Sequence, residues 1–96
     1  MARITTHPGE MLNEEFLLPM QLSARALARQ MGVPANRITG IVKGQRSVTA
    51  DTAIRLEKVL GMSAVFWMRL QDSYDLSKAM AEADYSAIER LDTHAA

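Results

Sequence analysis

The sequence predicts an all-α domain built from five to six helices, and three observations lead to this prediction. Apolar residues recur at helical spacing in successive segments, and short breaks with proline or glycine separate these segments. No segment shows the sustained apolar–polar alternation that is typical of a strand. The chain has 96 residues, of which 48% are hydrophobic, which suits one compact domain.

The first predicted helix begins at Pro8, where a missing N–H is harmless in the first turn. Glu10 follows in that turn and favours the helix dipole. Its apolar stripe consists of Met11, Leu12, Phe16 and Leu17. Pro19 is predicted to stop this helix.

The second and third predicted helices are short and follow each other closely. Ser23 is the predicted N-cap of the second helix, and Gly32 ends it in a left-handed conformation. Pro34 stands near the start of the third helix, which runs to Val42 or Lys43 before Gly44. Two such helices joined by a tight glycine-containing turn form a helix-turn-helix arrangement.

Two longer segments complete the helical pattern. Thr49 caps the first of them and Gly61 ends it, with an apolar stripe of Ala53, Ile54, Leu56 and Leu60. The last long helix carries Phe66, Trp67, Leu70 and Tyr74 at helical spacing. It either breaks near Asp75 or continues to Ala83, and a final short amphipathic piece would include Ile88 and Leu91.

The domain organisation expected from these elements is a single unit over residues 1–96. Within it, residues 22–61 are expected to form the helix-turn-helix core. Residues 62–96 are expected to form a helical extension for dimerisation or partner binding.

Charge is unevenly distributed along the chain, although 11 basic residues balance 11 acidic ones. Residues 23–58 contain seven basic and two acidic side chains, whereas both flanking segments carry an excess of acid. A phosphate backbone responds to local charge rather than to the sum, so the middle segment favours nucleic-acid binding.

The outward face of the third helix supports this interpretation. A rotation of about 100° per residue places Ile38, Ile41 and Val42 on its inner side. The opposite side has no carboxylate and consists of Asn36, Thr39, Gly40 and Lys43, with Arg37 at its edge. Asparagine, threonine, arginine and lysine can bond base edges or phosphates in the major groove. We expect Gly40 to leave room where the groove floor is closest.

A family resemblance narrows this prediction. The stretch "LSARALARQMGVPANRITGIVKGQRSVTADTAIRLEKVLGMS" resembles the five-helix, lambda-repressor-like DNA-binding domain of XRE-family regulators. The flanking words "HPGEML" and "FWMRLQDSYDL" resemble the HigA antitoxin branch of that family, and the match covers about residues 7–80.

The resemblance implies which residues contact DNA. It places a recognition helix at residues 35–43, with contacts from Asn36, Arg37, Thr39 and Lys43. Ala35 and Gly40 on the same helix also belong to the expected DNA-binding set. The loop and cap that hold phosphates are Gln45, Arg46, Ser47 and Thr49, while Ser23 and Arg25 begin the helix that crosses the backbone. Ala35 and Ala24 depart from the polar residues of many relatives, so we expect fewer direct base contacts.

The resemblance also implies two protein partners. Relatives of this kind are homodimers that bind an inverted repeat in double-stranded operator DNA, with recognition helices about 34 Å apart. Phe66, Trp67, Leu70 and Tyr74 are core candidates, and part of this stripe is the expected dimer interface. A small basic RNase toxin is the second implied partner, and the acidic N-terminal helix and tail could face it.

Several classes of function are not expected. There is no cysteine, and the two histidines lie at opposite ends, so we expect no metal and no cofactor. The longest apolar run, "AVFWM", is too short for a membrane span, and the first ten residues lack the apolar core that is typical of a signal peptide. A soluble, cytoplasmic protein that is not an enzyme is expected.

The leading hypothesis is an antitoxin that represses its own operon and neutralises a cognate RNase toxin. One alternative is a stand-alone XRE-type repressor without a toxin, because its DNA-reading unit would look the same. Another is a protein-only toxin-binding module, which Ala35 and Ala24 leave open.

Overall fold

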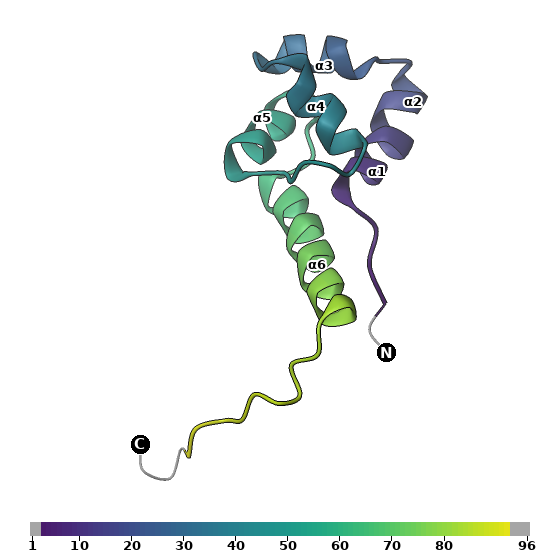
Figure 1. The fold of residues 1–96 in the computed structure, drawn as a ribbon. Coiled ribbons are helices and arrows are strands. Elements are labelled where there is room, and N and C mark those ends of the chain that lie inside the picture. The colour runs from purple at the N-terminus through teal and green to yellow at the C-terminus, as the bar shows by residue number, and fades with distance from the viewer. Residues whose placement is uncertain (1–2, 93–96) are drawn as a thin grey trace.

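The computed structural model describes residues 3–92, which contain seven helical elements and no strand (Figure 1). The elements are α1 (Pro8–Leu12), the π-helix η1 (Asn13–Leu17), α2 (Leu18–Met20), α3 (Ala24–Met31), α4 (Ala35–Val42), α5 (Ala50–Leu60) and α6 (Ala64–Glu82). Since α1, η1 and α2 form one continuous segment, the described residues form five helical units, and the predicted all-α class is confirmed.

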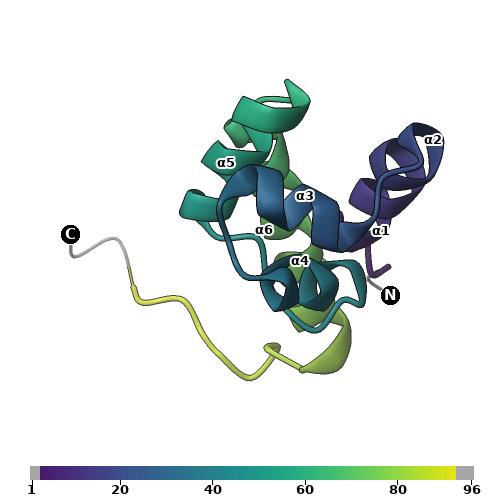
Figure 2. The same cartoon turned by 90° about the horizontal axis from the view of Figure 1, so that it is seen from above.

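The core lies where α3, α4 and α5 meet the first half of α6. Leu27, Ile38, Leu56 and Trp67 come from these four helices, and all four side chains are fully buried. Seen from above, α3 crosses the middle of the body, with α5 on one side and α1 and α2 on the other (Figure 2). The apolar stripes of the sequence therefore converge on a single core.

The helix boundaries follow from local capping chemistry. Ser23, Thr49 and Ser63 each precede a helix, and each side-chain oxygen accepts a hydrogen bond from a backbone N–H in the first turn. Gly32 and Gly61 end α3 and α5 with φ values of 74° and 87°. The predicted boundaries of α3 and α5 are confirmed.

The prediction that Pro19 stops the first helix is wrong. The Leu18 N–H donates to the carbonyl of Asn13, five residues earlier, and the helix continues to Met20. This wider turn relieves the collision between a proline ring and the preceding carbonyls. The helix ends instead at Gln21, whose φ of 52° is left-handed.

The C-terminal part also differs from expectation. Helix α6 runs without a break to Glu82, so the alternative of a break near Asp75 is wrong. The final amphipathic helix is absent from the described residues, and Ile88 and Leu91 are 75% and 86% exposed. Ile54, expected in the apolar stripe of α5, is exposed as well.

The molecule is elongated, because α6 and the chain that follows it project away from the body (Figure 1). Its radius of gyration is 16.9 Å and its extents are 56 × 27 × 20 Å. A compact chain of this length would have a radius of about 12–13 Å. The second half of α6 therefore buries little surface within the protomer.

No helix within residues 3–92 has the length and apolar character that crossing a membrane requires.

Candidate nucleic-acid interface

Helix α4 presents a polar surface because its apolar residues point inward. Ile38 and Ile41 are fully buried against α3 and the rest of the core. Asn36 and Lys43 are exposed, and Thr39 is half-buried. These side chains therefore occupy the outward positions expected of them. Ala35, by contrast, packs against the core.

The C-terminus of α4 is closed by a Schellman motif. Gly44 has a φ of 74°, its N–H donates to the carbonyl of Ile41, and the Gln45 N–H donates to that of Gly40. This motif turns the chain sharply after Lys43. As a result, the loop that follows α4 folds back beside that helix.

Arg46 lies over Gly40, which explains the glycine in a way that differs from the sequence interpretation. A Cβ atom at position 40 would lie 3.3 Å from the Cβ and 3.4 Å from the Cδ of Arg46. The missing side chain therefore makes room for the arginine stem. The expectation that Gly40 leaves space at the groove floor stays a prediction.

Arg37 is held by Asp51 in the first turn of α5. The Arg37 Nη1 lies 2.6 Å from the Asp51 Oδ2, and the Arg55 Nε donates to the same oxygen over 3.0 Å. Arg55 also donates to the carbonyl of Met31 at the end of α3. These bonds from Arg37 and Arg55 hold the pKa of the Asp51 carboxyl below its ordinary value. One carboxylate thus connects α4 with α5 and the end of α3.

A hollow of about 270 Å³ lies beside α4 at the start of α5. Its lining consists of Arg37, Arg46, Ser47, Thr49 and Thr52. This hollow is suitable for an anion such as phosphate. It is bordered by two guanidinium groups, by hydroxyls and by the positive end of the α5 dipole. Four of the predicted DNA-contacting residues line this hollow together.

The remaining predicted DNA contacts lie at the edges of this surface. Ser23 caps α3 by accepting a hydrogen bond from the Ala26 N–H over 3.0 Å, and Arg25 is exposed on the first turn. Gln45 is exposed in the loop after α4.

Gln71 fixes the loop that carries Arg46 and Ser47, and the sequence analysis did not find this residue. Its Oε1 accepts a hydrogen bond from the Val48 N–H over 2.7 Å, and its Nε2 donates to Asp75. Gln71 is buried, so this bond is protected from water. The available signal was a polar residue one turn after Trp67, on the side of α6 that faces the core.

Gly9 allows α1 to lie directly on α4, and this contact was also missed. A Cβ atom at position 9 would lie 1.7 Å from the Ile41 carbonyl oxygen, which is a steric overlap with backbone. The backbones of the two helices therefore touch here. Pairing between positions 9 and 41 is non-local and leaves no pattern in the sequence.

The four residues expected at a dimer interface have different environments. Trp67 is 0% exposed and packs on Phe16 and Phe66, with ring centroids 5.6 Å apart in both pairs. It offers no surface to a second copy, and its inclusion in an interface is corrected. Phe66, Leu70 and Tyr74 are half-buried, and Tyr74 contacts His7 edge-to-face at 4.7 Å.

The fold and the surface of α4 define a helix-turn-helix protein. The helix-turn-helix family model matches residues 14–67, and the chain belongs to this family. Three similar proteins indicate which branch of this family the chain resembles. Virulence-associated protein I of Dichelobacter nodosus is 51% identical over 85% of this chain and 74% of its own length.

Antitoxin HigA-1 of Vibrio cholerae is 43% identical over 71% of this chain and 64% of its own length. A structure of the antitoxin HigA of Pseudomonas aeruginosa with the higBA promoter is also similar. It is 41% identical, covers 95% of this chain and 98% of its own, and has a TM-score of 0.84. The resemblance to the HigA branch is thereby confirmed.

Proposed function

We propose that this chain is an antitoxin that binds operator DNA through α4 and neutralises a basic RNase toxin. The observation that carries the DNA half is the acid-free outer surface of α4 beside the hollow lined by Arg37 and Arg46. The helix width suits the major groove, and the two arginines suit flanking phosphates. The similarity to the Pseudomonas aeruginosa structure supports this assignment.

The residues divide into two roles in this proposal. Asn36, Thr39 and Lys43 read base edges, because they are the polar side chains on the outward surface of α4. Arg46, Ser47 and Thr49 hold the backbone, because they border the hollow at the α5 N-terminus. Since Ala35 is turned toward the core, direct readout rests on few side chains.

The protein acts as a homodimer in this proposal, with the second half of α6 at the interface. Leu76 and Met80 lie one turn apart on that helix and are 64% and 56% exposed. Exposed apolar residues at helical spacing favour pairing with a second helix. This surface lies further along α6 than the stripe from Phe66 to Tyr74.

The DNA half is tested by selecting binding sites from a random library and comparing two variants. Asn36→Ala should cost about 1–3 kcal/mol on the selected site and little on random DNA. Arg46→Ala should weaken binding to both DNAs and flatten the salt dependence. Selection of no site, or an equal loss for Asn36→Ala on both DNAs, would contradict base readout.

The toxin half is tested by affinity purification from the native cell, with the tag at either terminus. A stoichiometric small basic protein in both preparations is the expected result. The alternative function, a stand-alone repressor, requires retention of promoter DNA with no such protein. Retention of the basic protein by a chain that selects no DNA site would indicate a protein-only module.

A further inference from the structure

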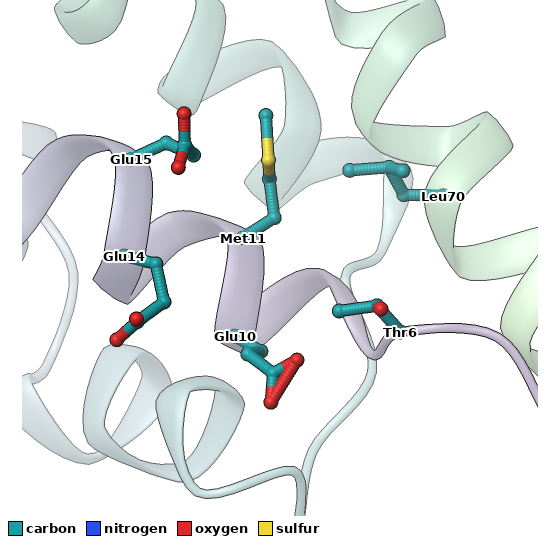
Figure 3. Close-up of a pocket in the computed structure, with 6 residues that line it drawn as sticks. All are labelled: Thr6, Glu10, Met11, Glu14, Glu15 and Leu70. Atoms are coloured by element: carbon teal, nitrogen blue, oxygen red, sulfur yellow. The ribbon is translucent and has the colours of Figure 1, made fainter.

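A groove between the N-terminal helical segment and α6 has an apolar floor and an acidic border (Figure 3). Its volume is about 250 Å³, and its lining consists of Thr6, Glu10, Met11, Glu14, Glu15 and Leu70. Met11 and Leu70 approach each other from opposite walls, and the three carboxylates stand on the α1–η1 wall. This volume is below the range of about 300–1,000 Å³ for drug-sized ligands, so it suits one or two side chains.

The acidic residues of the groove come from two parts of the N-terminal segment. Glu10 lies on α1, and Glu14 and Glu15 lie on η1, which the Leu18 N–H closes by donating to the Asn13 carbonyl. All three side chains line the groove, and their carboxylates point to different sides of it (Figure 3).

The walls of the groove are fixed by aromatic contacts at two places. Phe16 on η1 packs on Trp67 of α6, and His7 before α1 packs on Tyr74 of α6. The groove is therefore already formed in the protomer, which lowers the entropic cost of filling it.

The charges of the groove are uncompensated. The ion pairs found within residues 3–92 involve Asp51 and Glu82, and none involves Glu10, Glu14 or Glu15. Carboxylates without an ion-pair partner attract a cation. Nor does the described part of the chain hold any group of three side chains arranged for a metal ion. The chemistry favours an organic cation that also has an apolar stem.

We propose that this groove is a docking site for a lysine or arginine side chain of a basic protein partner. The aliphatic stem would lie on Met11 and Leu70, and the cationic head would reach the carboxylate of Glu14 or that of Glu15 at the border of the groove. The inference rests on the antitoxin half of the proposed function, because that half supplies a basic protein. The proposal identifies the surface on which such a protein binds. This surface is the groove between the N-terminal segment and α6, and it is separate from the contact that Gly9 of α1 makes with α4.

The test uses the full chain and a short peptide with the repeated unit leucine-arginine-serine as the probe. Two control peptides replace the leucines with alanine or the arginines with glutamate. In an amide NMR titration, the first peptide should shift the signals of Thr6, Met11 and Leu70. Both controls should bind at least about tenfold more weakly, because each lacks one of the two required contacts.

The Glu14→Gln/Glu15→Gln variant should bind the peptide about tenfold more weakly, and Glu10→Gln about threefold. The matched control is Glu82→Gln/Glu89→Gln, which removes the same charge from the C-terminal part and should change affinity less than twofold. Shifts located elsewhere, self-association without peptide, or equal losses in both double variants would overturn the proposal. Operator binding by the Glu14/Glu15 variant should equal that of the parent, so failure of this proposal is distinguishable from failure of DNA binding.

Discussion

Arg37 on α4 and Asp51 at the start of α5 are joined by a 2.6 Å contact between Nη1 and Oδ2. The same carboxylate oxygen accepts from Arg55, so a single acid restrains two arginines beside the proposed DNA surface. Arg37 and Arg55 share this one negative charge, so the charge of Arg37 is partly compensated in the absence of DNA. This arrangement leads to a prediction that differs from that for a free arginine.

Replacing Asp51 should strengthen binding to random DNA. In Asp51→Asn, Arg37 would be released to pair with phosphate, and one repulsive charge would be lost. The slope of log affinity against log salt should steepen by about one on random DNA. Fluorescence anisotropy with labelled random duplexes measures this slope, and Asp72→Asn on α6 is the charge-matched control. A slope that changes equally in both variants would show that net charge, rather than Arg37, is responsible.

Replacing Gly40 with alanine should increase the stability of the fold and weaken DNA binding. Gly40→Ala should raise the free energy of unfolding by about 0.5–1 kcal/mol, because alanine is the better helix former. The added Cβ would displace the Arg46 stem and weaken binding to all DNA sequences several-fold. Urea unfolding and anisotropy on the same samples check both effects. Arg46→Ala should reproduce the loss of affinity without the gain in stability, and unchanged affinity in Gly40→Ala would contradict the role given to this contact.

Replacing Gly9 should damage the fold itself. Gly9→Ala should lower the free energy of unfolding by about 3 kcal/mol, since the Ile41 carbonyl cannot move without distorting α4. Urea unfolding measures the change. The neighbouring exposed residue provides the control, and Glu10→Ala should cost less than about 1 kcal/mol. Equal effects in the two variants would mean that α1 does not pack closely on α4 in solution.

Stability should fall as the pH decreases below neutrality because of His7. Its Nδ1 accepts a hydrogen bond from the Gly9 N–H over 2.9 Å, which requires the neutral ring. Burial lowers the pKa of His7 below its ordinary value of 6.5, although Asp75 opposes this shift. The unfolded chain therefore binds the proton first, and the contribution is complete above pH 6.5 and is lost as pH falls through the folded pKa.

Urea unfolding at pH 7.5 and pH 5.5 checks this dependence. His7→Asn keeps an N-cap acceptor without a titrating group, so the difference between the two pH values should become smaller. An undiminished difference in His7→Asn would assign the effect to other groups.

The features that sequence predicted correctly are those that depend on a few neighbouring residues. Ser23 and Thr49 cap the helices that directly follow them, and the inward positions of Ile38 and Ile41 follow from helical periodicity. Asn36 and Lys43 face outward for the same reason.

The features that sequence reasoning missed depend on residues far apart in the chain. The partner of Gly40 is an arginine in the next loop, and the partner of Gly9 is a backbone carbonyl more than thirty residues away. Pro19 failed as a helix end because the π-turn before it changes the local geometry. Composition and periodicity carry no information about such contacts until the helices are placed in space.

The hydrogen bond between Gln71 and Val48 determines where this chain can be divided. The family model ends at residue 67, and the expected helix-turn-helix core ends at residue 61. Both limits fall before Gln71, whose side chain holds the loop after α4 from a position on α6. A fragment cut at either limit would keep α4 and lose the bond that supports the loop after it, which is the loop proposed to bind phosphates. Exchange of C-terminal segments between relatives should therefore begin beyond Asp75. The segment 24–49 is then transplanted together with the part of α6 that holds the loop after α4.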